Sequence, residues 1–440
     1  MAAVEQVFAR DVGASDPFAT FVSAALRPLH WLMPAPSVTF LAMLGLMLFH
    51  SPDGPPFIYD RLALGILIFA VFLRACVLRE PLWVGGSVTW PLLALLLLAL
   101  RDALAQTYTA EVWSVFAAKW FVPIALYIAA AHVFQGKSEL HQFETFALLA
   151  FAYLSLTSIF FIAGFKTFIF PRFILDESLG IHADRARGPF LQAVANGLAL
   201  NLLGLIALDS FRRRRLRGVW ALLLMVVWPL AILATKTRAV WLSFATSIAA
   251  LALFSSSGRL RRACLAILFC GAVVLAAVVS LTDHHRSLDE RLQENGPVAF
   301  RVEIYKAGWE MFLRKPVIGW GGKEMQVELS HRISDFQQEE YYFHNTFLEI
   351  LVQYGVIGLS LYLWMIFELF RIGRRGSVGK YSPRDSFLDH EFRALWPIFL
   401  FVYLINAMFV VMNYQFVNGL VFSIAAMLNA QNRRTELHGS

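Results

Sequence analysis

The sequence has few cysteines and few charged residues, and each scarcity excludes a class of protein. Only three cysteines occur among 440 residues, Cys76, Cys264 and Cys270, and all three fall inside hydrophobic segments. That placement argues against a disulfide framework and against a thiolate metal cage. Charged residues make up 16% of the chain and hydrophobic residues 58%, which is more apolar surface than a soluble core of this length can bury. The composition predicts a polytopic membrane protein.

Hydrophobic runs that are long enough, or nearly so, to cross a hydrocarbon layer of about 30 Å recur along the chain. They predict an all-α fold of about twelve transmembrane helices. The expected spans are 36–50, 61–78, 87–101, 112–134, 144–165, 189–208, 216–235, 237–254, 261–281, 345–370, 394–410 and 414–431.

The spans divide the chain into five expected parts. A cytoplasmic N-terminus at 1–36 precedes the first nine helices at 37–281, an outer loop domain at 282–344 precedes the last three helices at 345–431, and a cytoplasmic tail covers 432–440. No removable signal peptide is expected at the start. The helical spacing of apolar residues within 1–36 suits an interfacial helix and a helix packed on the bundle equally well.

The formal net charge of +7 is concentrated in short loops on alternate sides of the expected helices. This is the positive-inside pattern, so these loops and both termini are predicted to be cytoplasmic. We interpret the basic residues as topology anchors and not as a surface for nucleic acid. They are Arg212 to Arg215 with Arg217, then Arg259, Arg261 and Arg262, then Arg371, Arg374, Arg375 and Lys380, and finally Arg433 and Arg434.

Three stretches are then expected to face outward, at 166–188, 235–238 and 282–344, and each carries basic residues that the positive-inside rule disfavours there. For any one of them, a snorkelling or salt-bridged side chain is an equally good interpretation. Several guanidinium groups beside a histidine at the outer boundary would suit a lipid-borne phosphate or diphosphate. The residues concerned are Arg185, Arg187, Lys236, Arg238, Arg301 and His344.

The outer loop has internal order of its own. Val302, Tyr305, Trp309 and Phe312 recur at helical spacing, which predicts a helix that packs on the bundle as a lid through this stripe. The Pro and Gly residues of 315–322 predict a turn whose backbone closely approaches another part of the protein. The turn lacks the spacing of a nucleotide-binding loop. The charged residues that follow are interpreted as a solvated face.

A metal or a pair of catalytic carboxylates is not expected. The outer loops contain no Asp-x-Asp pair, and the cluster of Asp283, His284 and His285 is better explained as an exposed loop start than as a metal site. No two outer acids stand out for a retaining two-carboxylate scheme. These observations favour a transfer reaction that takes place in a single displacement step, without a cofactor.

Four sequence elements together resemble the superfamily of O-antigen ligases and Wzy-type polymerases. The resemblance covers about 180–360 in motif and the whole chain in topology. Its most specific part is the His-Asn element with the glycines downstream. The four elements are Arg185 to Phe190 with Asn196, Thr235 to Arg238, the run of Arg301, Trp309, Pro316 and Gly319 to Gly321, and His344 to Leu348 with Gly355 to Leu359.

The resemblance implies a GT-C-like membrane glycosyltransferase that uses neither nucleotide sugars nor a metal. Its donor would be a glycan on undecaprenyl diphosphate, presented at the periplasmic face of the bacterial inner membrane. Its acceptor would be lipid A-core or another lipid-linked glycan. By motif, His344 takes the catalytic role, while Arg187, Arg238 and Arg301 take the diphosphate. Arg185 competes with Arg187 for one position, and Lys236 is a less secure member of the set.

Three functions remain open at this stage. Ligation of O-antigen to lipid A-core in lipopolysaccharide biosynthesis is slightly preferred over polymerisation of O-antigen or exopolysaccharide repeat units. The preference rests on a compact chain with one dominant outer loop. A transporter of lipid-linked glycan is disfavoured, because no internal repeat is visible and the polar residues gather at the outer rim and not at the bilayer midplane.

Overall fold

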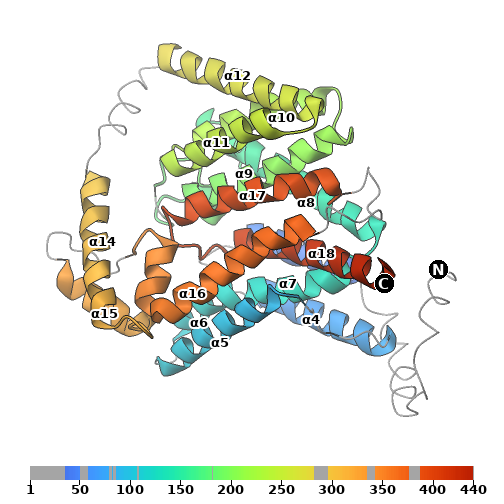
Figure 1. Cartoon of the computed structure of the whole chain (residues 1–440). Coiled ribbons are helices and arrows are strands. Elements are labelled where there is room, and N and C mark those ends of the chain that lie inside the picture. The colour runs from blue at the N-terminus through green and yellow to red at the C-terminus, as the bar shows by residue number, and fades with distance from the viewer. Residues whose placement is uncertain are drawn as a thin grey trace, which may run out of the picture.

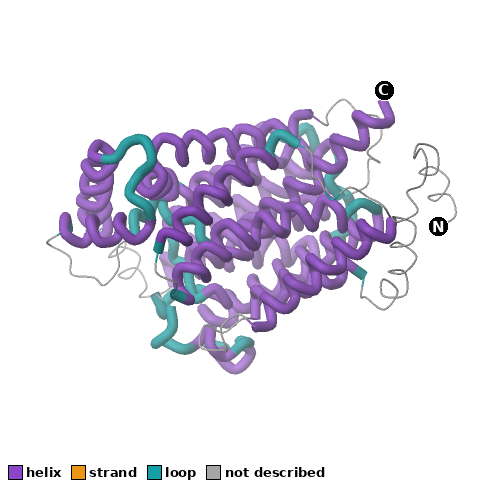
Figure 2. Tube along the Cα trace, turned by 90° about the horizontal axis from the view of Figure 1, so that it is seen from below, coloured by secondary structure: helices purple, strands orange, loops and turns teal. Residues whose placement is uncertain are grey.

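The computed structural model describes residues 35–49, 58–78, 82, 86–106, 109–180, 182–281, 296–333, 342–375 and 387–439, and the regular structure within these ranges is helical. Figures 1 and 2 show the helices packed side by side in a bundle, with α14 and α15 across one end. The expected interfacial segment and the cluster of Asp283, His284 and His285 lie outside the described residues.

Each predicted apolar range overlaps a helix in the described part of the chain. The helices in these ranges are α3 (Pro36–Phe49), α4 (Ile58–Leu78), α5 (Thr89–Ala105), α6 (Ala110–Phe116), η1 (Ala117–Phe121), α7 (Val122–Val133), α8 (Lys137–Ile162), α9 (Ala193–Arg212), α10 (Val219–Ala234), α11 (Arg238–Phe254), α12 (Gly258–Leu281), α16 (Thr346–Arg375), α17 (His390–Ala407) and α18 (Gln415–Gly439).

Among the described residues, six helices are long and apolar enough to cross a membrane by length and composition. The helices α3, α10 and α11 are apolar but shorter. The chain is therefore a multi-pass helical membrane protein. The six stretches are Tyr59–Leu78, Val112–Val133, Lys137–Ile162, Ala193–Arg212, Gly258–Ala277 and Thr346–Arg374.

Helix α9 lies at the centre of the bundle, and nearly all of its side chains are buried. Its polar residues are bonded to neighbouring segments, as a low-dielectric interior requires. Asn196 Nδ2 donates to Ser158 Oγ at 3.0 Å and to the Ala186 carbonyl at 2.9 Å. Asn201 Nδ2 donates to Ser243 Oγ at 3.0 Å. These bonds connect α9 to α8, to α11 and to the segment before it.

The predicted break between two apolar runs at 235–237 is present, where α10 ends at Ala234 and α11 begins at Arg238. Thr235 Oγ1 donates to the Ile232 carbonyl at 2.7 Å, and Thr237 Oγ1 donates to the Thr235 carbonyl at 2.9 Å. Lys236 has a positive φ of 47°. The turn reverses the chain without a longer loop.

The predicted outer helix is α14 (Gly296–Arg314), but half of the predicted contact stripe is wrong. Val302 and Trp309 are exposed, at 62% and 53%. The buried face carries Ile304, Ala307 and Met311 instead, and these pack with Phe343. Tyr305 and Phe312 of the predicted stripe are partly buried against this cluster, and Gly308 lets the Phe343 ring approach α14 closely.

A second helix in the predicted outer loop, α15 (Gly322–Arg332), was not expected from the sequence. It buries Met325 and Leu329 in the same apolar cluster as α14. Its charged residues lie on the opposite side, where Arg332 pairs with Glu328 and Glu310. The interpretation of these charges as a solvated face missed the helical spacing of the apolar residues between them.

The Pro and Gly turn of 315–322 closely approaches α16, at a point where that helix is broken. Gly355 has a φ of 66°, outside the helical region. The turn inserts its backbone into the break: Trp320 N donates to the Val352 carbonyl at 3.0 Å, Gly321 N to the Gln353 carbonyl at 2.9 Å, and Val356 N to the Pro316 carbonyl at 2.8 Å. The interruption of α16 is thus compensated by hydrogen bonds from the outer loop.

At the other end of the bundle, arginines interpreted as topology anchors form a buried network of ion pairs. Arg213 contacts Glu144 on α8 and Asp209 on α9, while Arg212 joins Asp209 to Asp389 at the start of α17. These side chains are at most 10% exposed. The arginines therefore also hold three helices together, which their loop position alone did not indicate.

Candidate active site

His344 lies immediately before α16 on the end of the bundle that α14 and α15 cover. Its φ of 49° is left-handed, which costs a non-glycine residue conformational energy and is common at functional sites. The next residue caps the helix: Asn345 Oδ1 accepts from Phe347 N at 2.9 Å and from Leu348 N at 3.1 Å. Tyr305 Oη on α14 donates to the His344 carbonyl at 3.3 Å. The backbone of His344 is therefore held by Tyr305 on α14 and by the capped start of α16.

Arg301 and His182 approach His344 closely enough for their charges to act on it. Burial lowers the pKa of His344 below its ordinary value of 6.5, and the positive charges of Arg301 and His182 lower it further. The Phe300 ring contacts the imidazole edge to face, with centroids 6.3 Å apart. The imidazole is therefore neutral at pH 7, which is the form that can accept a proton.

The Asp184 carboxylate, two residues after His182, lies close to two of the predicted cations. Lys236 Nζ lies 4.0 Å from Asp184 Oδ2, and Arg185 Nε lies 3.9 Å from Asp184 Oδ1. The Ala186 amide donates to the Ala234 carbonyl at 3.0 Å, which joins the segment of 182–190 to the turn between α10 and α11. Arg238 is exposed at the first position of α11, two residues from Lys236.

Arg187 is directed into the protein. It is 1% exposed, and its guanidinium donates to the carbonyls of Ile174, Asp176 and Leu179. The bond to Ile174 measures 3.2 Å. Arg187 therefore shapes the loop between α8 and α9, whereas the side chain of Arg185 is 16% exposed beside Asp184.

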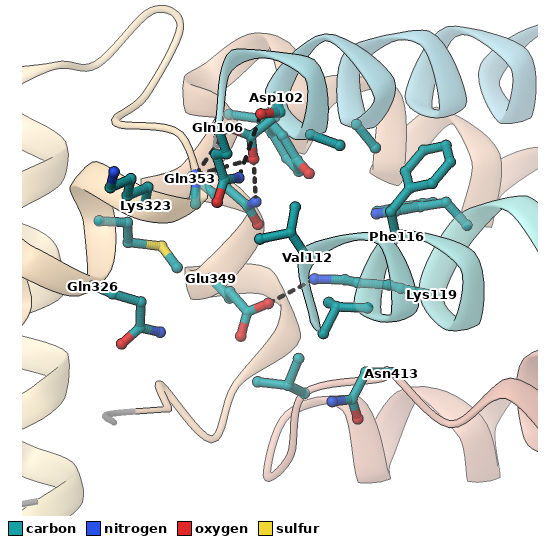
Figure 3. Close-up of a pocket in the computed structure, with 18 of the residues that line it drawn as sticks. Asp102, Gln106, Val112, Phe116, Lys119, Lys323, Gln326, Glu349, Gln353 and Asn413 are labelled. Atoms are coloured by element: carbon teal, nitrogen blue, oxygen red, sulfur yellow. Dashed lines mark hydrogen bonds and ion pairs between the residues drawn. The ribbon is translucent and has the colours of Figure 1, made fainter. Parts of the chain in front are cut away.

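A cavity of about 270 Å³ lies between α5, η1, α15 and α16, and its lining mixes charged, amide and apolar side chains. Figure 3 shows Lys119 and Glu349 directed toward one another across it, with Nζ and Oε1 2.6 Å apart. Asp102 accepts from Gly322 N at 3.0 Å and from Gln353 Nε2 at 2.6 Å. The lining includes Tyr342, two residues before His344.

The family comparison agrees with the resemblance proposed from the sequence. Residues 220–363 match the family model described as O-Antigen ligase. The resemblance is therefore confirmed over residues 220–363, which are similar to an O-antigen ligase domain. That segment contains Lys236, Arg238, Arg301 and His344, whereas Arg185 and Arg187 precede it. A comparison with curated proteins gave no match.

The polar residues of the cavity were not predicted from the sequence as site residues, neither those within 220–363 nor those before it. A signal was present, because Lys119 and Glu349 are ionisable residues inside predicted apolar spans. Such residues are costly in a membrane and mark functional sites by default. His182 was also passed over, although it lies three residues before Arg185. Among the described residues, no group of three His, Cys, Asp or Glu side chains is arranged to hold a metal ion.

Proposed function

We propose that the protein transfers a glycan from undecaprenyl diphosphate to an acceptor hydroxyl at the periplasmic face of the inner membrane. The observation that carries the proposal is a half-buried histidine of lowered pKa beside Arg301, at the head of α16 and inside the segment that matches the O-antigen ligase model. A base and a cationic group at one membrane boundary are what this transfer requires. The chain would span the membrane about twelve times, with both termini in the cytoplasm.

The proposed reaction is a single displacement that inverts the anomeric carbon. The acceptor oxygen forms a bond to that carbon while the bond from the carbon to the phosphate oxygen breaks. His344 accepts the hydroxyl proton, which its neutral form allows at ambient pH. The leaving undecaprenyl diphosphate carries the negative charge, and fixed cations at its position stabilise the transition state. No step in this scheme requires a metal or a nucleotide sugar.

Arg301, Arg238, Arg185 and Lys236 are proposed to contact the diphosphate. The sequence left Arg185 and Arg187 as alternatives, and the geometry favours Arg185, because three backbone carbonyls occupy the Arg187 guanidinium. Arg187 would then position the loop that carries Arg185. Arg185 and Lys236 both lie near Asp184, which would hold them in place until an anion displaces it.

Ligation of O-antigen to lipid A-core is the preferred reaction, and polymerisation of lipid-linked repeat units is the alternative. The two share a donor and differ in the acceptor. A lipopolysaccharide gel of a strain lacking the gene distinguishes them. Loss of all capped lipopolysaccharide, with long lipid-linked chains accumulating, indicates a ligase. One repeat unit left on the core indicates a polymerase.

The same deletion strain tests the proposal against transport of a lipid-linked glycan. A transferase leaves its donor on the periplasmic side when it is lost, whereas a transporter leaves it on the cytoplasmic side. Digestion of spheroplasts with a glycosidase that cannot cross the membrane measures the side. Protection of the accumulated glycan from the enzyme would contradict the proposed function.

A further inference from the structure

The cavity between α5, η1, α15 and α16 has a different chemistry from the cationic region around His344. Its charged residues come as both signs: Lys119 pairs with Glu349 inside it, and Asp102 faces it with its carboxylate bonded to Gly322 and Gln353. Lys323 also lines the cavity, so two carboxylates balance two ammonium groups and the cavity has no excess positive charge for a phosphate. Figure 3 shows the amides of Gln106, Gln353 and Asn413 around the same space.

We propose that this cavity binds a neutral sugar unit of one of the two glycan substrates, an inference that rests on the proposed function. Sugar hydroxyls donate and accept hydrogen bonds, so they need carboxylates and amide groups close together, and the cavity supplies both. The side chains of Phe116, Trp120 and Tyr354 add the apolar walls that small-molecule sites have.

The cavity adjoins the candidate catalytic residue. Tyr342 and Glu349 line it and flank His344 in the sequence. Two residues of extended chain span no more than about 7 Å, so the Cα atom of Tyr342 in the cavity wall lies within that distance of the Cα atom of His344. Thr346 Oγ1 donates to the Val410 carbonyl at 2.8 Å and accepts from Met412 N at 3.0 Å. These bonds hold the segment that carries Asn413 against the start of α16.

Together with a neighbouring space, the cavity is also large enough to hold a sugar unit. A second space of about 520 Å³ lies beside the turn of 315–321 and shares Asp102, Gln353 and Tyr354 with the first. Small-molecule sites range from about 300 to 1,000 Å³. Together the two spaces suit a sugar ring with a continuation of the glycan chain.

The backbone around Lys119 is unusual in a way that supports a binding role. Lys119 belongs to η1, a π-helical segment between α6 and α7. Such segments are rare and frequent at functional sites. The Lys119 side chain is 7% exposed and its nitrogen reaches Glu349 on a helix 230 residues away in the sequence. Maintaining this pair in a membrane protein is costly, so it is expected to serve a ligand.

The first test is kinetic, with the full-length protein in nanodiscs. The donor probe is lipid-linked glycan extracted from the strain lacking the gene, and the acceptor probe is lipid A-core from that strain. The double variant Lys119→Gln with Glu349→Gln keeps a neutral hydrogen-bonding pair. It should raise the KM for one probe at least about tenfold and leave kcat within a few fold. The probe affected identifies whether the sugar belongs to donor or acceptor.

The matched control is Glu310→Gln, which makes the same kind of change in a half-exposed ion pair with Arg332 on the outer surface. It should leave both KM values unchanged. Unchanged KM values in the double variant would overturn the inference. Should the double variant fail to fold, Gln106→Leu removes one amide from the cavity without removing the ion pair and is judged by the same criterion.

A second test does not depend on activity. A photo-crosslinking phenylalanine at Val112, which lines the cavity, should capture glycan in cells that carry His344→Ala. The same group at Leu253, which is 71% exposed on α11, should capture lipid without glycan. Absence of glycan at both positions would overturn the inference even if transfer is demonstrated. Capture at Val112 without any transfer by the wild-type protein would support the cavity and contradict the proposed reaction.

Discussion

At the scale of the residue, the charge beside His344 controls its proton affinity. Burial and two nearby positive groups lower the pKa of His344, so the neutral base persists to a lower pH than for an ordinary histidine. The rate of a reaction that needs the neutral base falls only as the pH drops through this lowered pKa. The acidic limb of kcat/KM should therefore lie below pH 6.5.

Arg301→Gln should move that acidic limb to higher pH, because it removes a positive charge that opposes protonation of His344. The profile of kcat/KM against pH measures the shift, whatever the loss in absolute rate. Lys306→Gln on the same helix is the control, because it removes an exposed charge that does not act on His344, and it should leave the limb in place. A limb that stays fixed or moves to lower pH in Arg301→Gln would contradict the assignment.

Arg185 and Arg187 should separate into a functional and a structural residue. Arg187→Ala leaves three loop carbonyls without their donor, and each buried unpaired partner costs about 1–3 kcal/mol, so the melting temperature and the abundance should fall. Arg185→Ala should leave both unchanged and reduce glycan transfer. Thermal unfolding in detergent and a transfer assay measure the two effects. Equal stability with equal loss of transfer in both variants would refute the division.

At the scale of the element, the break in α16 depends on a glycine. A Cβ at Gly355 would lie 2.2 Å from the Val317 carbonyl oxygen, and the φ of 66° is left-handed. Gly355→Ala should therefore displace the turn of 315–322 and lower the melting temperature, because a backbone conformation that only glycine readily adopts costs other residues about 1–3 kcal/mol. Gly65→Ala in α4 meets no atom within 4 Å and should be neutral or stabilising. An unchanged Gly355→Ala variant would show that the turn does not need the break.

Hydrophobic runs were sufficient to place helices, because a helix of apolar residues is decided by local composition. They were insufficient for α15, where Met325 and Leu329 are separated by charged residues, and for the face of α14, where two apolar stripes competed. The position of Gly319 to Gly321 against the broken α16 depends on a contact between distant segments, which no local pattern specifies. The sequence indicated which cationic residues to consider, one position at a time. It could not show that the Arg187 side chain turns inward, because that direction depends on three backbone carbonyls earlier in the chain.

At the scale of the whole molecule, polar chemistry is distributed between the two ends of the bundle. One end holds buried ion pairs among α8, α9 and α17, and the other holds His344, the cations and the polar cavity. In Figure 1 the second end is the left side, where α14 and α15 lie. The proposed function requires that end to be periplasmic.

Single cysteines should report the proposed orientation once the three native cysteines are replaced. A cysteine at Lys323 on α15 should react with a membrane-impermeant maleimide in intact spheroplasts. A cysteine at Arg214, after α9, should react only when the membrane is permeabilised. Both positions are exposed, so the difference reports the side of the membrane. The opposite pattern would place His344 toward the cytoplasm and contradict the proposed donor site.

The most direct measurement is glycan transfer by the purified full-length protein, wild type against His344→Ala, from lipid-linked donor to acceptor at pH 7. A general base contributes about 10²–10⁴ to a rate, so the variant should lose at least about a hundredfold in kcat while keeping its melting temperature and its KM for the donor. A variant that retains kcat within a few fold of the wild type would contradict the claim that His344 accepts the acceptor's proton.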